Sequence, residues 1–244
     1  MTSLTVDYEF DWGGRIKSWR AIEKMTIPLL ECFEKAGAKA TFFVSGETVE
    51  STKPFLKMIA NAGHEIASHG FNHNLRYDLL TKEELLNEIV RSKGVLEEAT
   101  GNEIIGFRTP QFRKNQWTEE VLTELGFLYD SSSVNTSLAG RYKERQYEYG
   151  LLPQIPVSTI YGRFPAGTKW INILGKKIDP HEHKVIYLHP FDSMSIKETL
   201  NSYRKEIPLS VLAFYLTRFG SILKTVEHLS KDSVTLASTV RKSI

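Results

Sequence analysis

Short apolar segments alternate with helical patterns along most of this chain, and that alternation constrains its fold more than any other feature. Strand-like runs, rich in β-branched and aromatic residues, lie at about 4–10, 40–44, 64–68, 103–107, 127–129 and 184–188. Amphipathic helical patterns lie at about 26–35, 53–62, 82–98, 118–125 and 208–229. Such alternation favours a parallel sheet covered by helices, either open or closed into a barrel.

Local signals support several of these elements. The run Ala40 to Val44 is continuously apolar, as expected of a strand buried on both faces. Thr81 and Glu84 have the spacing of a capping box, which predicts that a long helix begins there. Pro28 suits the first turn of the helix predicted over 26–35. No linker interrupts the 244 residues, which indicates a single domain over 1–244.

The charge and the cysteine content exclude several classes of partner and site. The chain has 31 basic and 29 acidic residues, a net charge of +2, which argues against a nucleic-acid partner. Its single cysteine excludes an internal disulfide and a CxxC metal knuckle. No apolar stretch reaches the length of a membrane span, and the N-terminal residues lack the pattern of a secretory signal. We therefore expect a cytoplasmic protein, with peripheral membrane contact and oligomeric state left open.

Reactive residues follow the apolar strands, where sites of parallel α/β folds collect. Asp7, Glu9 and Asp11 alternate along the first strand, so they would share one face about 6–7 Å apart. His69 and His73 follow the third strand and are four residues apart, so one helical turn would bring them to one metal ion.

Two further groups complete a hydrolytic set. Arg108 ends the fourth predicted strand, where it can pair with one of the acids and keep it ionised. His189 ends the last predicted strand, and its near-neutral pKa suits proton donation. One carboxylate and two imidazoles form the three-ligand arrangement of hydrolytic zinc, while a second carboxylate can accept a proton from water. The same triad also occurs in non-haem iron oxygenases, which remain an alternative.

These segments, in this order, resemble the polysaccharide deacetylases, the NodB-homology family of carbohydrate esterases. The matching motifs are TVDYEFD, HGFNH, RTP and YLHP, and the resemblance covers about residues 2–225. YDSS and IPVS place the chain near bacterial exopolysaccharide and lipopolysaccharide deacetylases and their allantoinase-like relatives. The resemblance implies a distorted (β/α) barrel with a core over about 2–225 and a C-terminal helix over about 208–229.

The resemblance also implies residue roles. Asp7 would be the general base, held ionised by Arg108, and His189 the general acid, steered by Asp130. The metal ligands would be Glu9, His69 and His73, and the ion a divalent metal, zinc in most members. The substrate would be an N-acetylated sugar, lipid-linked, nucleotide-linked or within an oligosaccharide, used in surface-glycan assembly. The backbone amide of Gln111 would bind the developing oxyanion.

Departures from the family pattern leave alternatives open. The family's adjacent acidic pair is replaced by spaced acids, so Asp11 competes with Glu9 as ligand. Gly70 replaces a hydroxyl residue of the histidine motif, and Gln111 replaces a common aromatic residue. Candidates to stack on a sugar ring are Trp12, Phe112, Trp117 and Trp170. An allantoinase-like cyclic amide hydrolase and a catalytically dead glycan-binding module are the other functions compatible with this sequence.

Overall fold

A six-stranded parallel sheet forms the centre of the computed structural model, in the order β5-β4-β3-β2-β1-β8. The structure describes residues 1–135, 152–174, 178, 183–208, 210, 212–213 and 222–241. The strands of the sheet are β1 Thr2–Tyr8, β2 Ala40–Val44, β3 Glu65–Ser68, β4 Gly106–Phe107, β5 Tyr129–Asp130 and β8 Lys184–Leu188. The sheet curls as a half-barrel, which confirms the predicted parallel α/β architecture.

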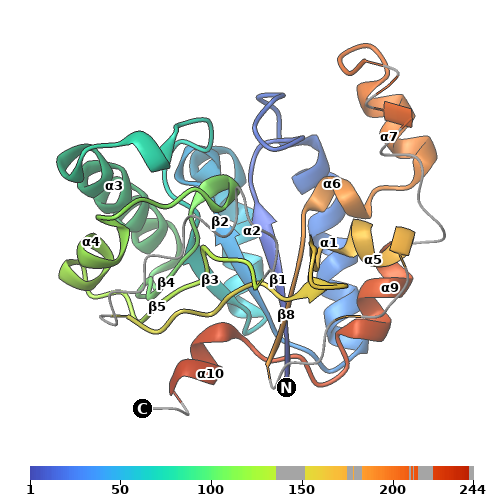
Figure 1. The fold of residues 1–244 in the computed structure, drawn as a ribbon. Helices are drawn as coiled ribbons and strands as arrows, with labels where there is room; N and C mark the ends of the chain where they lie inside the picture. The colour runs from blue at the N-terminus through green and yellow to red at the C-terminus, as the bar shows by residue number, and fades with distance from the viewer. Residues whose placement is uncertain are drawn as a thin grey trace.

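Helices surround the sheet (Figure 1). The longer helices are α1 Arg20–Lys35, α2 Val49–Asn61, α3 Lys82–Thr100, α7 Ile196–Tyr203 and α9 Ile222–Leu229. Shorter ones are α4 Thr118–Glu124, α5 Thr168–Leu174, α6 Pro190–Ser193 and α10 Leu236–Arg241. Single 3-10 turns lie at Gly46–Thr48, Tyr77–Leu79 and Pro110–Phe112, and a small antiparallel pair joins β6 Thr159–Ile160 to β7 Phe164–Pro165. Among the described residues, no helix has both the length and the apolar character needed to cross a bilayer.

The alternation of side chains along β1 separates two cores. Leu4, Val6 and Tyr8 pack into the main apolar cluster with residues of the surrounding helices. The opposite face of the sheet carries Thr5 and Asp7, near a smaller cluster that includes Phe43. Because strand side chains alternate, the residues that carry chemistry lie on the inner, concave face.

Several predicted boundaries need correction. Helix α1 begins at Arg20, six residues before the predicted start, and Pro28 lies inside it rather than in its first turn. The strand expected over 103–107 contains only Gly106–Phe107. The capping box at Thr81 is confirmed, since Thr81 Oγ1 accepts a hydrogen bond from the backbone of Glu84 and the Glu84 side chain accepts one from Thr81.

The end of the chain contributes to the inner core. Of the helix predicted over 208–229, the structure describes α9, whereas residues 209, 211 and 214–221 lie outside the described part. Leu236 and Val240 of α10 are buried in the inner cluster with Phe43. The buried core therefore continues beyond the predicted limit of residue 225.

Candidate metal centre and active site

The predicted site residues converge at the carboxyl ends of the parallel strands. Asp7 lies within β1 and Glu9 directly follows it, while His69 follows β3, Arg108 follows β4 and His189 follows β8. The parallel pairing of β1 with β8 and β2, and of β3 with β2 and β4, places these strand ends at one edge of the sheet. Residues separated by up to 182 positions, Asp7 and His189, are thereby brought together.

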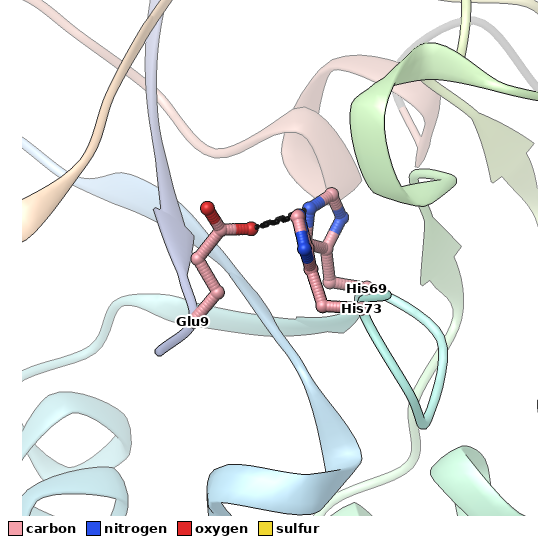
Figure 2. Close-up of side chains that lie close together, drawn as sticks. All are labelled: Glu9, His69 and His73. Atoms are coloured by element: carbon pink, nitrogen blue, oxygen red, sulfur yellow. Dashed lines mark ion pairs between the residues drawn. The ribbon is translucent and has the colours of Figure 1, made fainter. Parts of the chain in front are cut away.

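Glu9, His69 and His73 form the centre of this site. Glu9 Oε2 lies 2.5 Å from His73 Nε2 and 3.3 Å from His69 Nε2. One ligand atom from each of the three residues lies within 4.8 Å of the others, and all three residues are buried. Figure 2 shows the carboxylate of Glu9 and the two imidazole rings pointing toward one another.

Hydrogen bonds hold the ring of His69 and the backbone of His73. His69 Nδ1 lies 2.8 Å from the backbone oxygen of Arg108, to which it donates when Nδ1 carries the proton. That tautomer leaves Nε2 with a lone pair directed toward Glu9, as in metal-bound histidines. The backbone nitrogen of His73 donates to Glu47 Oε1 at 3.0 Å, which anchors the backbone of that residue, whereas Nδ1 of its ring has no hydrogen-bond partner among the described residues.

The chemistry of this donor set fits a divalent metal. Glu9 Oε2 is buried and accepts no hydrogen bond of regular geometry, although two imidazole nitrogens face it. Burial raises the pKa of Glu9, but the charge of His73 and the contacts of both imidazoles outweigh burial and hold that pKa well below its usual range. Burial lowers the pKa of His73, yet the Glu9 carboxylate raises it overall. Without a metal these groups need a shared proton, whereas a cation between them would satisfy all three.

Asp11 has a different role. Its Oδ2 atom accepts hydrogen bonds from the Ser18 hydroxyl and, at 3.2 Å, from the backbone nitrogen of Arg20. Its Oδ1 atom accepts one from the backbone of Ala21 at 3.2 Å. Because β1 ends at Tyr8, strict alternation does not extend to Asp11, which turns away to the first turn of α1. Between the two open ligand candidates, the structure places Glu9 with the histidines.

Arg108 and Asp7 form a buried ion pair beside the metal centre. Arg108 Nη1 donates to Asp7 Oδ1 at 2.6 Å and to Thr5 Oγ1 at 2.9 Å. Its Nη2 atom donates to Ser131 Oγ at 2.9 Å, and its guanidinium carbon lies 4.1 Å from the centre of the Phe43 ring. Arg108 is fully buried, so its position is determined by this network and Asp7 faces a fixed positive charge.

His189 faces Oε1 of Glu9, whereas His69 and His73 face Oε2. Asp192 holds His189 in this position. The Nε2 atom of His189 is 3.7 Å from Glu9 Oε1 and 4.0 Å from Asp7 Oδ2, while Nδ1 is 2.9 Å from Asp192 Oδ2. Burial lowers the pKa of this imidazole. The hydrogen bond and charge of Asp192, with the charges of Glu9 and Asp7, outweigh burial and raise the pKa to about 9.

Asp130 does not hold His189, and the predicted steering role is wrong. Its Oδ1 atom accepts hydrogen bonds from the Ser132 hydroxyl and backbone nitrogen, and its Oδ2 atom lies 3.4 Å from Lys114 Nζ. The YDSS segment uses this carboxylate to order its own turn. Asp192 takes the role instead, from the first turn of α6.

The Glu9, His69 and His73 cluster, Asp7 and His189 line one cavity of about 360 Å³. Its lining consists of Asp7, Glu9, Trp12, Gly13, Arg15, His69, His73, Thr109, Gln111, Phe112, Arg113, Tyr187, His189 and Phe191. Gln111 lies in the left-handed region, with φ of 55°, and the oxyanion role of its amide stays a prediction. Of the aromatic candidates, Trp12 and Phe112 line this cavity; Trp117 packs against the main core and Trp170 against Phe164.

The turn that carries the two histidines depends on Gly70, whose sequence motif indicates only the loss of a hydroxyl. Gly70 has φ of 70°, and a Cβ atom there would lie 2.1 Å from the Tyr77 hydroxyl oxygen. That hydroxyl accepts a hydrogen bond from the backbone of Phe71 and donates to Glu88. Glycine is therefore required by the close approach of Tyr77, a contact that no local sequence signal reveals.

A half-barrel with a buried Glu-His-His cluster, an arginine-paired aspartate and a histidine held by Asp192 offers the groups that a metal-dependent hydrolase uses. A family model for polysaccharide deacetylases matches residues 3–129, just over half of the chain. The chain therefore belongs to the polysaccharide deacetylase family, as its motifs suggested.

Curated relatives are similar over part of the chain. Peptidoglycan deacetylase of Helicobacter pylori is 31% identical over 114 residues, which are 47% of this chain and 39% of that protein. Peptidoglycan-N-acetylglucosamine deacetylase of Bacillus cereus is 31% identical over 118 residues, which are 46% of this chain and 41% of that protein. The chain spans less than half of the length of these relatives.

Solved structures of carbohydrate esterase family 4 share the fold. A family 4 acetyl xylan esterase from Clostridium thermocellum, in complex with a cobalt ion, superposes with a TM-score of 0.57 at 16% identity, over 99% of this chain and 90% of that one. A family 4 pseudoenzyme from Bacillus anthracis superposes with a TM-score of 0.58 at 16% identity, over 98% and 65%. These neighbours confirm the expected NodB-type (β/α) barrel.

Proposed function

We propose that this protein is a metal-dependent carbohydrate N-deacetylase that removes the acetyl group from an N-acetylated sugar of a bacterial surface glycan. The observation that carries the proposal is the position of Asp7 and His189 on one cavity with the Glu9, His69 and His73 cluster. A hydrolase of this kind needs a proton acceptor, a proton donor and a cation site within reach of one amide group.

Glu9, His69 and His73 would hold the metal ion, which we expect to be Zn²⁺. When bound, a divalent ion there would polarise the amide carbonyl and lower the pKa of a bound water. Three protein ligands would leave room for water and substrate on a bound ion, as in catalytic zinc sites. Other divalent ions accept the same ligands, so the preferred ion is settled by measurement.

Asp7 and His189 would divide the proton transfers. Arg108 Nη1 holds Asp7 through the 2.6 Å ion pair, and the Asp7 carboxylate would accept the proton of the attacking water. His189, whose Nε2 atom faces the cavity, would donate a proton to the departing amine nitrogen. The backbone amide of Gln111 would stabilise the negative charge that develops on the carbonyl oxygen.

The relatives support the choice of substrate class. Both curated relatives described above carry names of peptidoglycan deacetylases. A lipid-linked, nucleotide-linked or oligosaccharide N-acetyl sugar fits the same chemistry, including one used for lipopolysaccharide or capsule. The cytoplasmic location expected from the sequence stays a prediction, which cell fractionation tests.

The deciding experiment is acetate release by the purified, zinc-loaded protein from peptidoglycan fragments and from lipid-linked and nucleotide-linked N-acetyl sugars. The matched control is D7N, which keeps the shape of Asp7 but removes the proton acceptor. We expect release by the wild type, loss of release in D7N and unchanged zinc content in both. Zinc binding without acetate release from any substrate would contradict the proposal.

The same assays separate the alternatives. Ring opening of allantoin without acetate release would identify a cyclic amide hydrolase, and oxygen uptake dependent on ferrous iron would identify an oxygenase. Glycan binding that is unchanged in D7N and H189A, without turnover, would identify a binding module. Retention of Asp7, Arg108 and His189 in contact distance favours the enzyme over the module.

A further inference from the structure

We propose that the cavity contains an anion subsite, formed by Arg15, Thr109 and Arg113, that binds an acidic group on the N-acylated sugar. The acidic group is a phosphate, as on the anomeric carbon of a carrier-linked sugar, or a carboxylate, as on a lactyl or uronic acid substituent. This inference rests on the proposed function and narrows its substrate class from neutral N-acetyl sugars to acidic ones.

Two arginines reach the cavity from different loops. Arg15 belongs to the segment between β1 and α1, and Arg113 follows the 3-10 turn at Pro110–Phe112. Both line the same cavity as Asp7 and His189. Guanidinium groups are the side chains best suited to pair with phosphate and carboxylate, because they present parallel N–H donors.

The charge of Arg15 is not neutralised by an ion pair among the described residues, unlike the charges of Arg20 and Arg76. Arg20 pairs with Glu206 and Arg76 pairs with Asp78, each through an ion pair away from the cavity. Within the described ranges, no carboxylate lies in ion-pair distance of Arg15, whose side chain is exposed at the cavity. Its charge is thus available to a ligand.

Thr109 supplies an independent observation. Thr109 is fully buried and lines the cavity. Its Oγ1 atom has no hydrogen-bond partner among the described residues. Its backbone nitrogen already donates to Ser132 Oγ at 2.8 Å, so the hydroxyl is the group left over. A buried hydroxyl without a partner is unfavourable, which indicates that a ligand or its water completes the bond.

The charges that line the cavity also favour an anion. Asp7 and Glu9 are the acidic lining residues, and both are engaged: Asp7 with Arg108, Glu9 with two imidazoles. A divalent ion on the Glu9 cluster would add further positive charge. The cavity then attracts a negatively charged substrate more strongly than a neutral sugar.

The test compares matched charged and neutral substrates with the zinc-loaded full chain. The pairs are N-acetylglucosamine 1-phosphate against methyl N-acetylglucosaminide, and N-acetylmuramic acid against N-acetylglucosamine. We expect R15Q and R113Q each to raise KM for a charged member by about ten-fold and to leave the neutral member within about two-fold. R204Q, which changes an exposed arginine away from the cavity, is the control and should change neither.

The pair that responds identifies the source of the negative charge. A response confined to the phosphate pair assigns a phosphorylated sugar, and one confined to the muramic acid pair assigns a carboxylate. Equal effects of R15Q and R113Q on charged and neutral members, or no preference of the wild type for either charged member, would overturn the subsite.

Product binding separates this inference from the proposed function. Titration calorimetry of glucosamine 1-phosphate against glucosamine needs no turnover, and we expect R15Q and R113Q to weaken only the phosphate compound, by about ten-fold. Charge-selective binding without acetate release from any sugar would retain the subsite and reject the deacetylase. Acetate release without charge-selective binding would retain the deacetylase and reject the anion subsite.

The contribution of Thr109 is tested by T109V, which keeps the shape and removes the hydroxyl. We expect weaker binding of the charged compound with no fall in melting temperature, because the hydroxyl has no partner to lose. A lower melting temperature with unchanged binding would show that the hydroxyl is structural and would remove Thr109 from the subsite.

Discussion

Asp192 Oδ2 lies 2.9 Å from His189 Nδ1 and 3.1 Å from the backbone nitrogen of the same residue. One carboxylate oxygen thus fixes both the ring and the backbone of His189, at the start of α6. The stacked ring of Phe191, 4.6 Å from the imidazole centre, further restricts its rotation. Asp192 is accordingly a positioning residue, acting on substrate through His189.

We expect D192N to lower kcat by about 10- to 100-fold, because general acid catalysis needs an oriented and protonated imidazole. Burial lowers the pKa of His189 and Asp192 raises it, so removing the carboxylate lowers that pKa. The protonated donor is then lost at a lower pH, and the alkaline limb of the kcat profile shifts to lower pH. Profiles of kcat and KM against pH measure both effects.

D130N is the matched control for D192N. Asp130 contacts Ser132 and Lys114 rather than His189, so D130N should reduce stability without shifting the alkaline limb. A shift of the alkaline limb of the kcat profile in D130N, with none in D192N, would show that Asp130 steers His189, as the sequence predicted.

Metal content should depend on the buried cluster. We expect H69A, H73A and E9Q each to lose metal. Changing a residue that only contacts a ligand typically lowers metal affinity by about 10- to 100-fold, and removing one of three ligands should lower it further. Elemental analysis of the purified proteins, after dialysis against a defined zinc buffer, measures the change. Circular dichroism confirms that each variant is folded.

D11N is the control among the acids. Its side chain contacts Ser18, Arg20 and Ala21 at the start of α1, so D11N should keep the metal and lower the melting temperature. Metal loss in D11N together with retention in E9Q would exchange the two residues in the ligand set.

The sequence predicted the sheet better than it predicted the contacts between loops. Ala40–Val44 and Lys184–Leu188 are recovered at their predicted bounds because continuous apolar runs are read directly from local composition. Strand ends of parallel sheets meet at one edge, so the position of Asp7 on the first predicted strand, with His69 and Arg108 directly after two others, was enough to place them together.

Contacts set by the geometry of turns could not be predicted from the sequence. The choice between Asp130 and Asp192 depends on the turn into α6, and the choice between Glu9 and Asp11 depends on where β1 ends. Gly70 is explained only by Tyr77, seven residues later, which a single sequence does not place. Side-chain periodicity fixes faces within an element, whereas these relationships cross from one loop to another.

Stability should depend on the pairing of Arg108 with Asp7. R108M leaves the Asp7 carboxylate buried without its cation, and we expect unfolding free energy to fall by about 3–5 kcal/mol. Adding D7N removes the unpaired charge, so the double variant should be more stable than R108M alone, although inactive. Urea unfolding of the three variants and the wild type measures this coupling; additive losses would show that the pair contributes no mutual stabilisation.

His64 should make the fold sensitive to acid, away from the metal centre. It is 7% exposed, its Nδ1 atom accepts a hydrogen bond from the backbone of Ala40 at 3.0 Å, and the Phe33 and Phe42 rings lie beside it. Burial lowers the pKa of His64 to about 4, with a smaller effect of Lys39. The unfolded chain, with an ordinary pKa of about 6.5, therefore binds the proton more tightly than the folded one.

The stability contributed by neutral His64 is complete above pH ~6.5 and is lost as pH falls toward about 4, by roughly 2 kcal/mol after allowance for partial solvation. His64→Asn keeps an acceptor for Ala40 but does not titrate. Urea unfolding between pH ~7.5 and ~5, which covers the upper part of that titration, should show the wild type losing its advantage over H64N as pH falls. A constant difference between the two proteins across this range would contradict the assignment, because only a group with different pKa values in the folded and unfolded chain makes stability depend on pH.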